Sequence, residues 1–223
     1  WGVFNVADTV RELTGIENVK VGNDANVAAL GEMWQGGGKG YNNLVMVTLG
    51  TGVGGGVILG GKILTGSNGA GGEIGHIRVN YEEKDVCGCG KTGCLEQYAS
   101  ATGVVRLAKK ALEKKEKKTT LVADDLSAKT VFDAAKAGDE LAMDIVEKFG
   151  FYLGMALAHI SQVIDPEVFV IGGGVARAGQ IIIDEVSKNY EENVMFALKN
   201  KAFKMAELGN DAGIYGSARM VLD

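Results

Sequence analysis

The sequence predicts an α/β fold in which helices cover a β-sheet. Two runs of apolar and β-branched residues, at 43–49 and 167–171, have the pattern of buried strands. A long helical pattern at 139–164 precedes the second run, and strand and helix patterns alternate after it. Several strands, then helices, then strands and helices in alternation are typical of layered α/β domains.

The first half of the chain is predicted to contain most of the strands. The pair Gly60-Gly61 has the composition of a two-residue hairpin turn, and strand-like runs flank it. The elements predicted here are strands at 19–24, 43–49 and 77–80, a helix at 26–34 and a hairpin at 53–64.

The second half is predicted to be mostly helical. Gly138 breaks one helical pattern from the next, and the pair Asp165-Pro166 ends the longest helix, because the residue before a proline is disfavoured in a helix. The elements predicted here are helices at 94–118, 127–137, 139–164, 179–193 and 211–222, and strands at 167–171 and 202–208.

Length and composition limit the function classes. The chain has 223 residues, which fits one large domain or one domain and part of another. Its net charge of −5 argues against nucleic-acid binding, and no apolar run is long enough to span a membrane. Three cysteines and no export signal favour the cytoplasm. The chain opens on Trp1 rather than Met, so we expect it to be part of a longer protein.

One histidine and all three cysteines fall within nineteen positions, with the spacing H-x10-C-x-C-x4-C. The four residues are His76, Cys87, Cys89 and Cys94. A Cys3His set closes a tetrahedron around zinc and leaves no open position, which is typical of a structural site. The alternatives are ordinary free cysteines or a disulfide, and the clustering and the odd number of cysteines argue against them.

Two glycine-rich segments are candidates for phosphate or nucleotide binding. The run GTGVGGG at 50–56 formally contains G-x-G-x-x-G, but a strand-like stretch follows where a dinucleotide fold needs a helix. Its backbone N–H groups could still bind phosphate, with a plain turn as the alternative. The run Gly172-Gly173-Gly174 lies between a strand and a helix, where either a nucleotide site or a tight junction is expected.

The pair Asn23-Asp24 ends a predicted strand and precedes a helix. Asp24 either caps that helix or points its carboxylate into a cleft as a general base, and the spacing alone does not favour one over the other. The chain's other histidine, His159, lies within a helical pattern and is interpreted as an ordinary helix residue.

Together these segments resemble the ROK family of sugar kinases and sugar-sensing repressors, within the actin–hexokinase superfamily. The segment through YASATG at 98–103 is most similar to the bacterial ATP-dependent glucokinases of that family. The resemblance implies an actin-like ATPase (ribonuclease H-like) fold. The segments that carry it are NDANVAALGE at 23–32, LGTGVGGGV at 49–57, GGEIGH at 71–76, CGCGKTGCLE at 87–96 and VIGGGVA at 170–176.

The resemblance also implies roles for individual residues. Asp24 would be the catalytic base that takes the proton from the sugar 6-hydroxyl, and His76 would contact both the sugar and zinc. ATP with Mg²⁺ would be the phosphoryl donor. The acceptor would be a hexose, with glucose preferred, and the expected assembly is a homodimer. The implied contacts are Asn23, Asp24, Glu73, His76 and Glu96 to sugar; Gly50, Thr51, Gly52 and Gly54 to phosphate; Gly172, Gly173 and Gly174 to adenosine; and His76, Cys87, Cys89 and Cys94 to structural zinc.

The family's first phosphate loop, D-x-G-G-T, is not found in this chain. By resemblance, residues 1–26 end a small lobe, 27–210 form the large α/β lobe with the zinc loop, and 211–223 return to the small lobe. We therefore expect this chain alone to have little kinase activity. The alternative function is the sugar-sensing part of a repressor, but the presence of Asp24 and of the glycine run at 50–56 favours the kinase.

Overall fold

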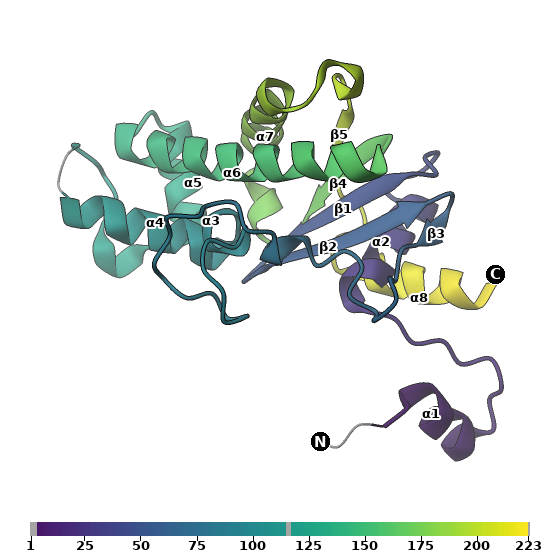
Figure 1. Cartoon of the computed structure of the whole chain (residues 1–223). Helices are drawn as coiled ribbons and strands as arrows, with labels where there is room; N and C mark the ends of the chain where they lie inside the picture. Colours follow the sequence, from purple (N-terminus) through teal and green to yellow (C-terminus); the bar gives the residue numbers. More distant parts are fainter. Residues whose placement is uncertain (1–3, 115–116, 223) are drawn as a thin grey trace.

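The computed structural model describes residues 4–114 and 117–222 and has a mixed five-stranded sheet at its centre (Figure 1). The strands lie in the order β3-β2-β1-β4-β5. β1 pairs antiparallel with β2 and parallel with β4, and β4 pairs parallel with β5. The strands are β1 (Leu44–Leu49), β2 (Val53–Leu59), β3 (Lys62–Ile63), β4 (Val168–Gly172) and β5 (Ala202–Met205).

Helices cover both faces of this sheet, so the predicted layered α/β fold is confirmed. The long helix α6 crosses one face with α7 beside it, while α2 and α8 lie on the other (Figure 1). The helices are α1 (Val6–Thr14), α2 (Asp24–Gln35), α3 (Glu96–Ala99), α4 (Ala101–Lys114), α5 (Ala128–Lys136), α6 (Glu140–Ile164), α7 (Gln180–Asn193) and α8 (Ala212–Leu222).

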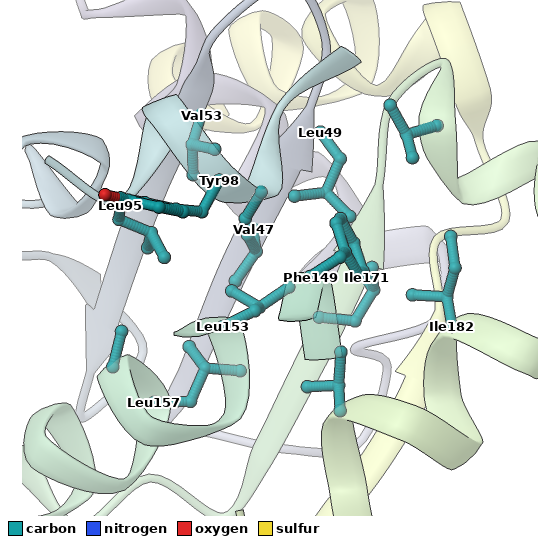
Figure 2. Close-up of a cluster of buried hydrophobic side chains, with 14 of the residues drawn as sticks. Val47, Leu49, Val53, Leu95, Tyr98, Phe149, Leu153, Leu157, Ile171 and Ile182 are labelled. Atoms are coloured by element: carbon teal, nitrogen blue, oxygen red, sulfur yellow. The ribbon is translucent and has the colours of Figure 1, made fainter. Parts of the chain in front are cut away.

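Alternation along β1 divides the core into two clusters. Val47 and Leu49 point toward α6, where they meet Phe149 and Leu153 in the larger cluster (Figure 2). Met46 points the other way, into the smaller cluster under α2. Both faces of β1 are buried, which explains why its sequence is a continuous apolar run instead of an alternating one.

Three predicted elements are corrected by the structure. Residues 19–23 pair with no strand among the described residues, and Asp24 already begins α2. Residues 77–80 form only an isolated bridge between Arg78 and Cys94. The helix predicted at 94–118 is interrupted at Ser100 and ends at Lys114; residues 115–116 of that prediction lie outside the described part. The Ser100 hydroxyl accepts from the Gly103 N–H and so begins a new helix.

α1 was not predicted from the sequence. Asn5 caps its first turn by accepting from the Asp8 N–H, and Gly15 ends it with φ 72°. No residue of α1 is buried, and the helix stands away from the rest of the structure (Figure 1). Within the described residues, no helix is both long enough and apolar enough to cross a membrane.

α8 packs directly against the outer side of α2, which makes two glycines necessary. A Cβ on Gly31 of α2 would collide with the Ala212 carbonyl oxygen, and a Cβ on Gly216 of α8 would collide with the Val27 carbonyl oxygen. The two backbones are therefore in contact, and the layer on this face is two helices thick. The lobe boundaries predicted at 26/27 and 210/211 stay a prediction.

The contact between α2 and α8 can be tested by adding one methyl group. We expect Gly216→Ala to lower the free energy of unfolding by about 2–3 kcal/mol, because the new Cβ forces two helix backbones apart. Urea unfolding measures the change. Gly213→Ala in the same helix is the matched control, since its Cβ would meet nothing within 4 Å. That variant should be neutral or stabilised by roughly 0.5–1 kcal/mol; equal losses in both variants would contradict the packing argument.

Candidate functional site

Two adjoining cavities, each of about 500 Å³, open where β1 and β4 end. Because these strands are parallel, their carboxyl ends lie at one edge of the sheet, which is the usual ligand position in open α/β sheets. The cavities share Gly173, Gly209 and Asn210. We name the two cavities for the ligands that the sequence resemblance implies. The acceptor cavity is also lined by Asp24, Thr48, Gly50, Gly52, Gly54 and Glu96. The donor cavity is also lined by Gly172, Gly174, Arg177, Ala206 and Asp211.

Asn23 and Asp24 occupy different positions at the start of α2. Asn23 is the N-cap of α2, since its side-chain oxygen accepts from the N–H groups of Ala25 and Asn26. Asp24 is the first helical residue, its side chain is exposed, and it lines the acceptor cavity. Among the described residues, its carboxylate accepts a hydrogen bond only from the neighbouring Ala25 N–H. Its remaining oxygen positions are therefore available to a ligand.

The glycine run at 50–56 divides into two parts with different roles. Residues 50–52 form the turn between β1 and β2 at the acceptor cavity, with the Gly50 N–H donating to the Gly52 carbonyl. Gly54 and Gly56 lie within β2 and face α2, where a Cβ on Gly56 would be 2.5 Å from the Ala29 Cβ. Packing therefore explains the glycines of β2, and only the turn is left to be explained by ligand binding.

The run Gly172-Gly173-Gly174 also satisfies a packing requirement. Gly173 has φ 88°, and a Cβ there would lie 2.6 Å from the Leu49 backbone. The chain can thus turn sharply against β1 only with glycine at this position. All three glycines line the donor cavity as well, so the tight junction that was predicted as one alternative borders a cavity, and the ligand site stays a prediction.

The four predicted zinc ligands meet in space. The ligand atoms of His76, Cys87, Cys89 and Cys94 all lie within 4.8 Å of one another. Cys89 Sγ is 3.5 Å from Cys94 Sγ, and Cys87 Sγ is 3.7 Å from His76 Nδ1. Burial, with a hydrogen bond to Glu96, raises the pKa of Cys87 to about 12. A bound cation would reverse this effect, because metal-bound thiols are deprotonated.

Glu96 connects this cluster to the acceptor cavity. Its Oε1 lies 2.9 Å from Cys87 Sγ and 3.7 Å from His76 Nδ1, and the residue lines the cavity beside Asp24. A Cβ on Gly52 would be 2.7 Å from Glu96 Oε2, so Gly52 leaves room for the carboxylate. The cluster, the carboxylate and the turn at 50–52 therefore form one connected unit.

A partly buried ion-pair network beside the cysteine loop was missed by the sequence analysis. Arg106 Nη1 lies 2.8 Å from both Glu83 and Asp85, and the Tyr98 hydroxyl donates to Glu83. Burial alone would raise the pKa of Glu83, but hydrogen bonds from Asp85 N–H, Tyr98 and Arg106 outweigh it and hold that pKa far below its usual value. The network ties the loop to α4. The charged residues at 82–85 and Arg106 are evident in the sequence, but their spacing does not predict that they form ion pairs.

Several predicted site residues lie outside the two cavities. Asn23, Glu73 and His76 are exposed and are not among the residues that line either cavity. Thr51 lines a smaller neighbouring cavity of about 350 Å³ together with Glu96 and Arg106. In contrast, the segment 209–211 was not predicted, although Gly209 and Asn210 line both main cavities and Asp211 lines the donor cavity. Its sequence, Gly-Asn-Asp, has the composition of a turn and gives no stronger signal than that.

A family model for the ROK family matches residues 1–223. The chain is 46% identical over 226 residues to a glucokinase of Halalkalibacterium halodurans, which covers 99% of this chain and 68% of that protein. Across such curated relatives the chain spans about two thirds of their length.

Solved structures show the same likeness. A ROK family glucokinase from Streptomyces griseus, in complex with glucose and AMPPNP, superposes with a TM-score of 0.82 at 35% identity, covering 96% of this chain and 71% of that one. A ROK family transcriptional regulator superposes with a TM-score of 0.85 at 29% identity, covering 97% and 55%. The predicted actin-like ATPase fold is confirmed by these likenesses. Because the family model matches the chain along its whole length, the chain belongs to the ROK family.

Proposed function

We propose that the protein containing this chain is an ATP-dependent sugar kinase that phosphorylates the 6-hydroxyl of a hexose, with glucose preferred. The observation that carries the proposal is the presence of two carboxylates, Asp24 and Glu96, in one cavity that adjoins a second, glycine-lined cavity. Relatives named as glucokinases, at 36–46% identity, support sugar phosphorylation by this site.

In this proposal the two cavities have different occupants. The sugar binds in the acceptor cavity, where Asp24 accepts the proton of the attacking hydroxyl and Glu96 accepts hydrogen bonds from other hydroxyls. The nucleotide, with its Mg²⁺, binds in the donor cavity with its phosphates directed toward the turn at 50–52. Phosphoryl transfer depends mainly on such positioning and on electrostatic stabilisation, so the closeness of the cavities is the essential requirement.

Zinc is proposed to hold the cysteine loop and, through it, Glu96. The donor set fits, since three thiols and one imidazole converge at distances that a single tetrahedral ion can bridge. In the structure the Cys87 thiol donates to Glu96 Oε1, and His76 Nδ1 lies 3.7 Å from the same oxygen, so the loop that zinc would hold also carries the neighbours of this carboxylate. Such orientation by neighbouring groups is a general feature of metal sites.

The alternative function is sugar sensing in a transcriptional regulator. It is favoured by the TM-score of 0.85 to a ROK family regulator. A sensor needs the sugar contacts but no proton acceptor, whereas Asp24 here is exposed in the cavity with oxygen positions available. Glucose-dependent release of ADP, measured on the protein that contains this chain, separates the two: a sensor releases none.

Metal content tests the zinc proposal. Cys94→Ser and His76→Gln should each reduce bound zinc from about one per chain to near zero. Each should also lower the melting temperature by roughly 4–8 °C, as a loss of ~2 kcal/mol does in a domain of this size. Elemental analysis and thermal unfolding measure both effects. The control is His159→Gln. His159 is the chain's other histidine and is exposed on α6, so this variant should keep its zinc. A wild-type protein without zinc would contradict the proposal.

Removal of the proposed base tests the mechanism. Asp24→Asn keeps the shape of the side chain but removes the proton acceptor, so turnover should fall by roughly 10²–10⁴-fold while sugar affinity changes little. Coupled assay and calorimetry measure the two quantities. Asp184→Asn, an exposed carboxylate on α7, should leave both unchanged. Near-normal turnover in Asp24→Asn would rule out Asp24 as the base.

Glu96 is expected to bind sugar without binding nucleotide. Glu96→Gln should raise the sugar dissociation constant by roughly tenfold or more, because a charge-assisted hydrogen bond is replaced by a weaker one. Affinity for AMPPNP should stay within about twofold. Zinc content must be measured in the same sample, since Glu96 also contacts Cys87. If the variant keeps its full zinc content and its sugar affinity is unchanged, Glu96 does not contact the sugar.

A further inference from the structure

Glu32, near the end of α2, is a fully buried carboxylate with three backbone donors. Its side chain is 0% exposed. Oε2 accepts from the N–H groups of Gly37 and Glu207, at 2.8 and 3.0 Å, and Oε1 accepts from the N–H of Leu208 at 2.9 Å. Burial of a carboxylate is costly unless it is hydrogen-bonded, and here backbone donors from two distant segments supply the bonds.

The surroundings of Glu32 are built around its carboxylate. A Cβ on Gly36 would collide with Glu32 Oε2, and a Cβ on Gly37 would collide with the Met205 carbonyl oxygen. Two glycines therefore let the chain after α2 approach both the carboxylate and the end of β5. A Gln at position 32 could not make the same bonds, because its NH₂ group would face one of the three donors.

The segment that Glu32 holds leads directly into the two cavities. Leu208, whose N–H it accepts, immediately precedes the 3₁₀ turn η5 (Gly209–Asp211). Gly209 and Asn210 line both cavities, and Asp211 lines the donor cavity. α8 begins at the next residue, Ala212, which lines the acceptor cavity. The wall between the cavities is thus attached to the carboxylate by two consecutive hydrogen bonds.

The same helix carries Asp24 at its other end. Glu32 lies eight positions after Asp24 in the helix. This corresponds to about 12 Å at the helical rise of 1.5 Å per residue. A helix packed between the sheet and α8 is a rigid spacer over this distance. The position of the wall relative to Asp24 is therefore set by one straight element and one buried carboxylate.

We propose that Glu32 is a positioning residue that holds the 207–211 segment in register with Asp24, so that the donor cavity accepts a nucleotide phosphate chain. The proposal rests on the kinase function proposed above. Glu32 touches neither cavity itself, and its effect on ligands is exerted through the backbone of Glu207 and Leu208. Loss of its charge should release the wall and weaken nucleotide binding far more than sugar binding.

The test compares Glu32→Gln with two controls in the protein that contains this chain. Glu167→Gln is chemically matched, since that carboxylate also accepts backbone N–H groups, from Asn42 and Asn43, but at the opposite end of β4. Ile145→Ala, at a buried position of α6, is matched for loss of stability. Calorimetry gives the dissociation constants of AMPPNP and glucose, thermal unfolding gives stability, and hydrogen–deuterium exchange follows the amides of 207 and 208.

We expect Glu32→Gln to raise the AMPPNP dissociation constant by roughly tenfold or more, the effect of losing a hydrogen bond to a charged group. Glucose affinity should stay within about threefold, and exchange at 207–208 should accelerate. Both controls should keep wild-type affinity for both ligands. If exchange accelerates or stability falls while AMPPNP affinity is unchanged, or if Ile145→Ala shows the same loss of affinity, Glu32 is structural only and the proposal is overturned. If the wild-type protein binds no AMPPNP, the kinase function falls as well, which separates the two failures.

Discussion

The close contact between α2 and the sheet is the constraint on which the rest of the structure depends. Gly54 and Gly56 present bare backbone to the helix, and the helix presents Ala25 and Ala29 in return. A Cβ on Gly56 would lie 2.6 Å from the Ala25 carbonyl oxygen. Only small residues on both surfaces allow the helix to lie this near, and any larger side chain would lift α2 away from the cavity that Asp24 lines.

This contact explains why one helix can serve two purposes. Its first residue reaches the acceptor cavity, and its last turn holds a carboxylate that fixes the wall of the donor cavity. α8 closes the outer side through Gly31 and Gly216, so that α2 is held from both directions. The site therefore depends on backbone-to-backbone packing as much as on the polar side chains within it.

Most of the fold could be predicted from the sequence because the relevant signals are local. The apolar runs of β1 and β4, the Gly60-Gly61 turn and the break at Gly138 all depend on neighbouring residues and were found. The strand predicted at 19–24 was wrong, because an extended run becomes a strand only when a partner lies beside it. Pairing is a long-range property that the run itself does not contain.

The candidate site was predictable to the same extent. The four proposed zinc ligands lie close in sequence, and their convergence was predicted from their spacing. The division of the glycine run into a turn and a packed strand could not be predicted from the sequence. Gly52 and Gly54 differ only in their neighbours in the fold, which are Glu96 for Gly52 and α2 for Gly54. Glu32 lies 175 and 176 residues before its two distant donors, Glu207 and Leu208, and no pattern near either end indicates that they meet.

The order of the elements also affects how the chain folds during synthesis. β1, β2 and β3 are consecutive and antiparallel, so this meander can form early, with α2 against it. α8, which covers the outer side of α2, begins 177 residues after α2 ends. At roughly 5–20 residues per second, a ribosome needs about 10–40 s to make that stretch. For that time the outer surface of α2 faces solvent or a chaperone, and the layer is complete only once α8 has been made.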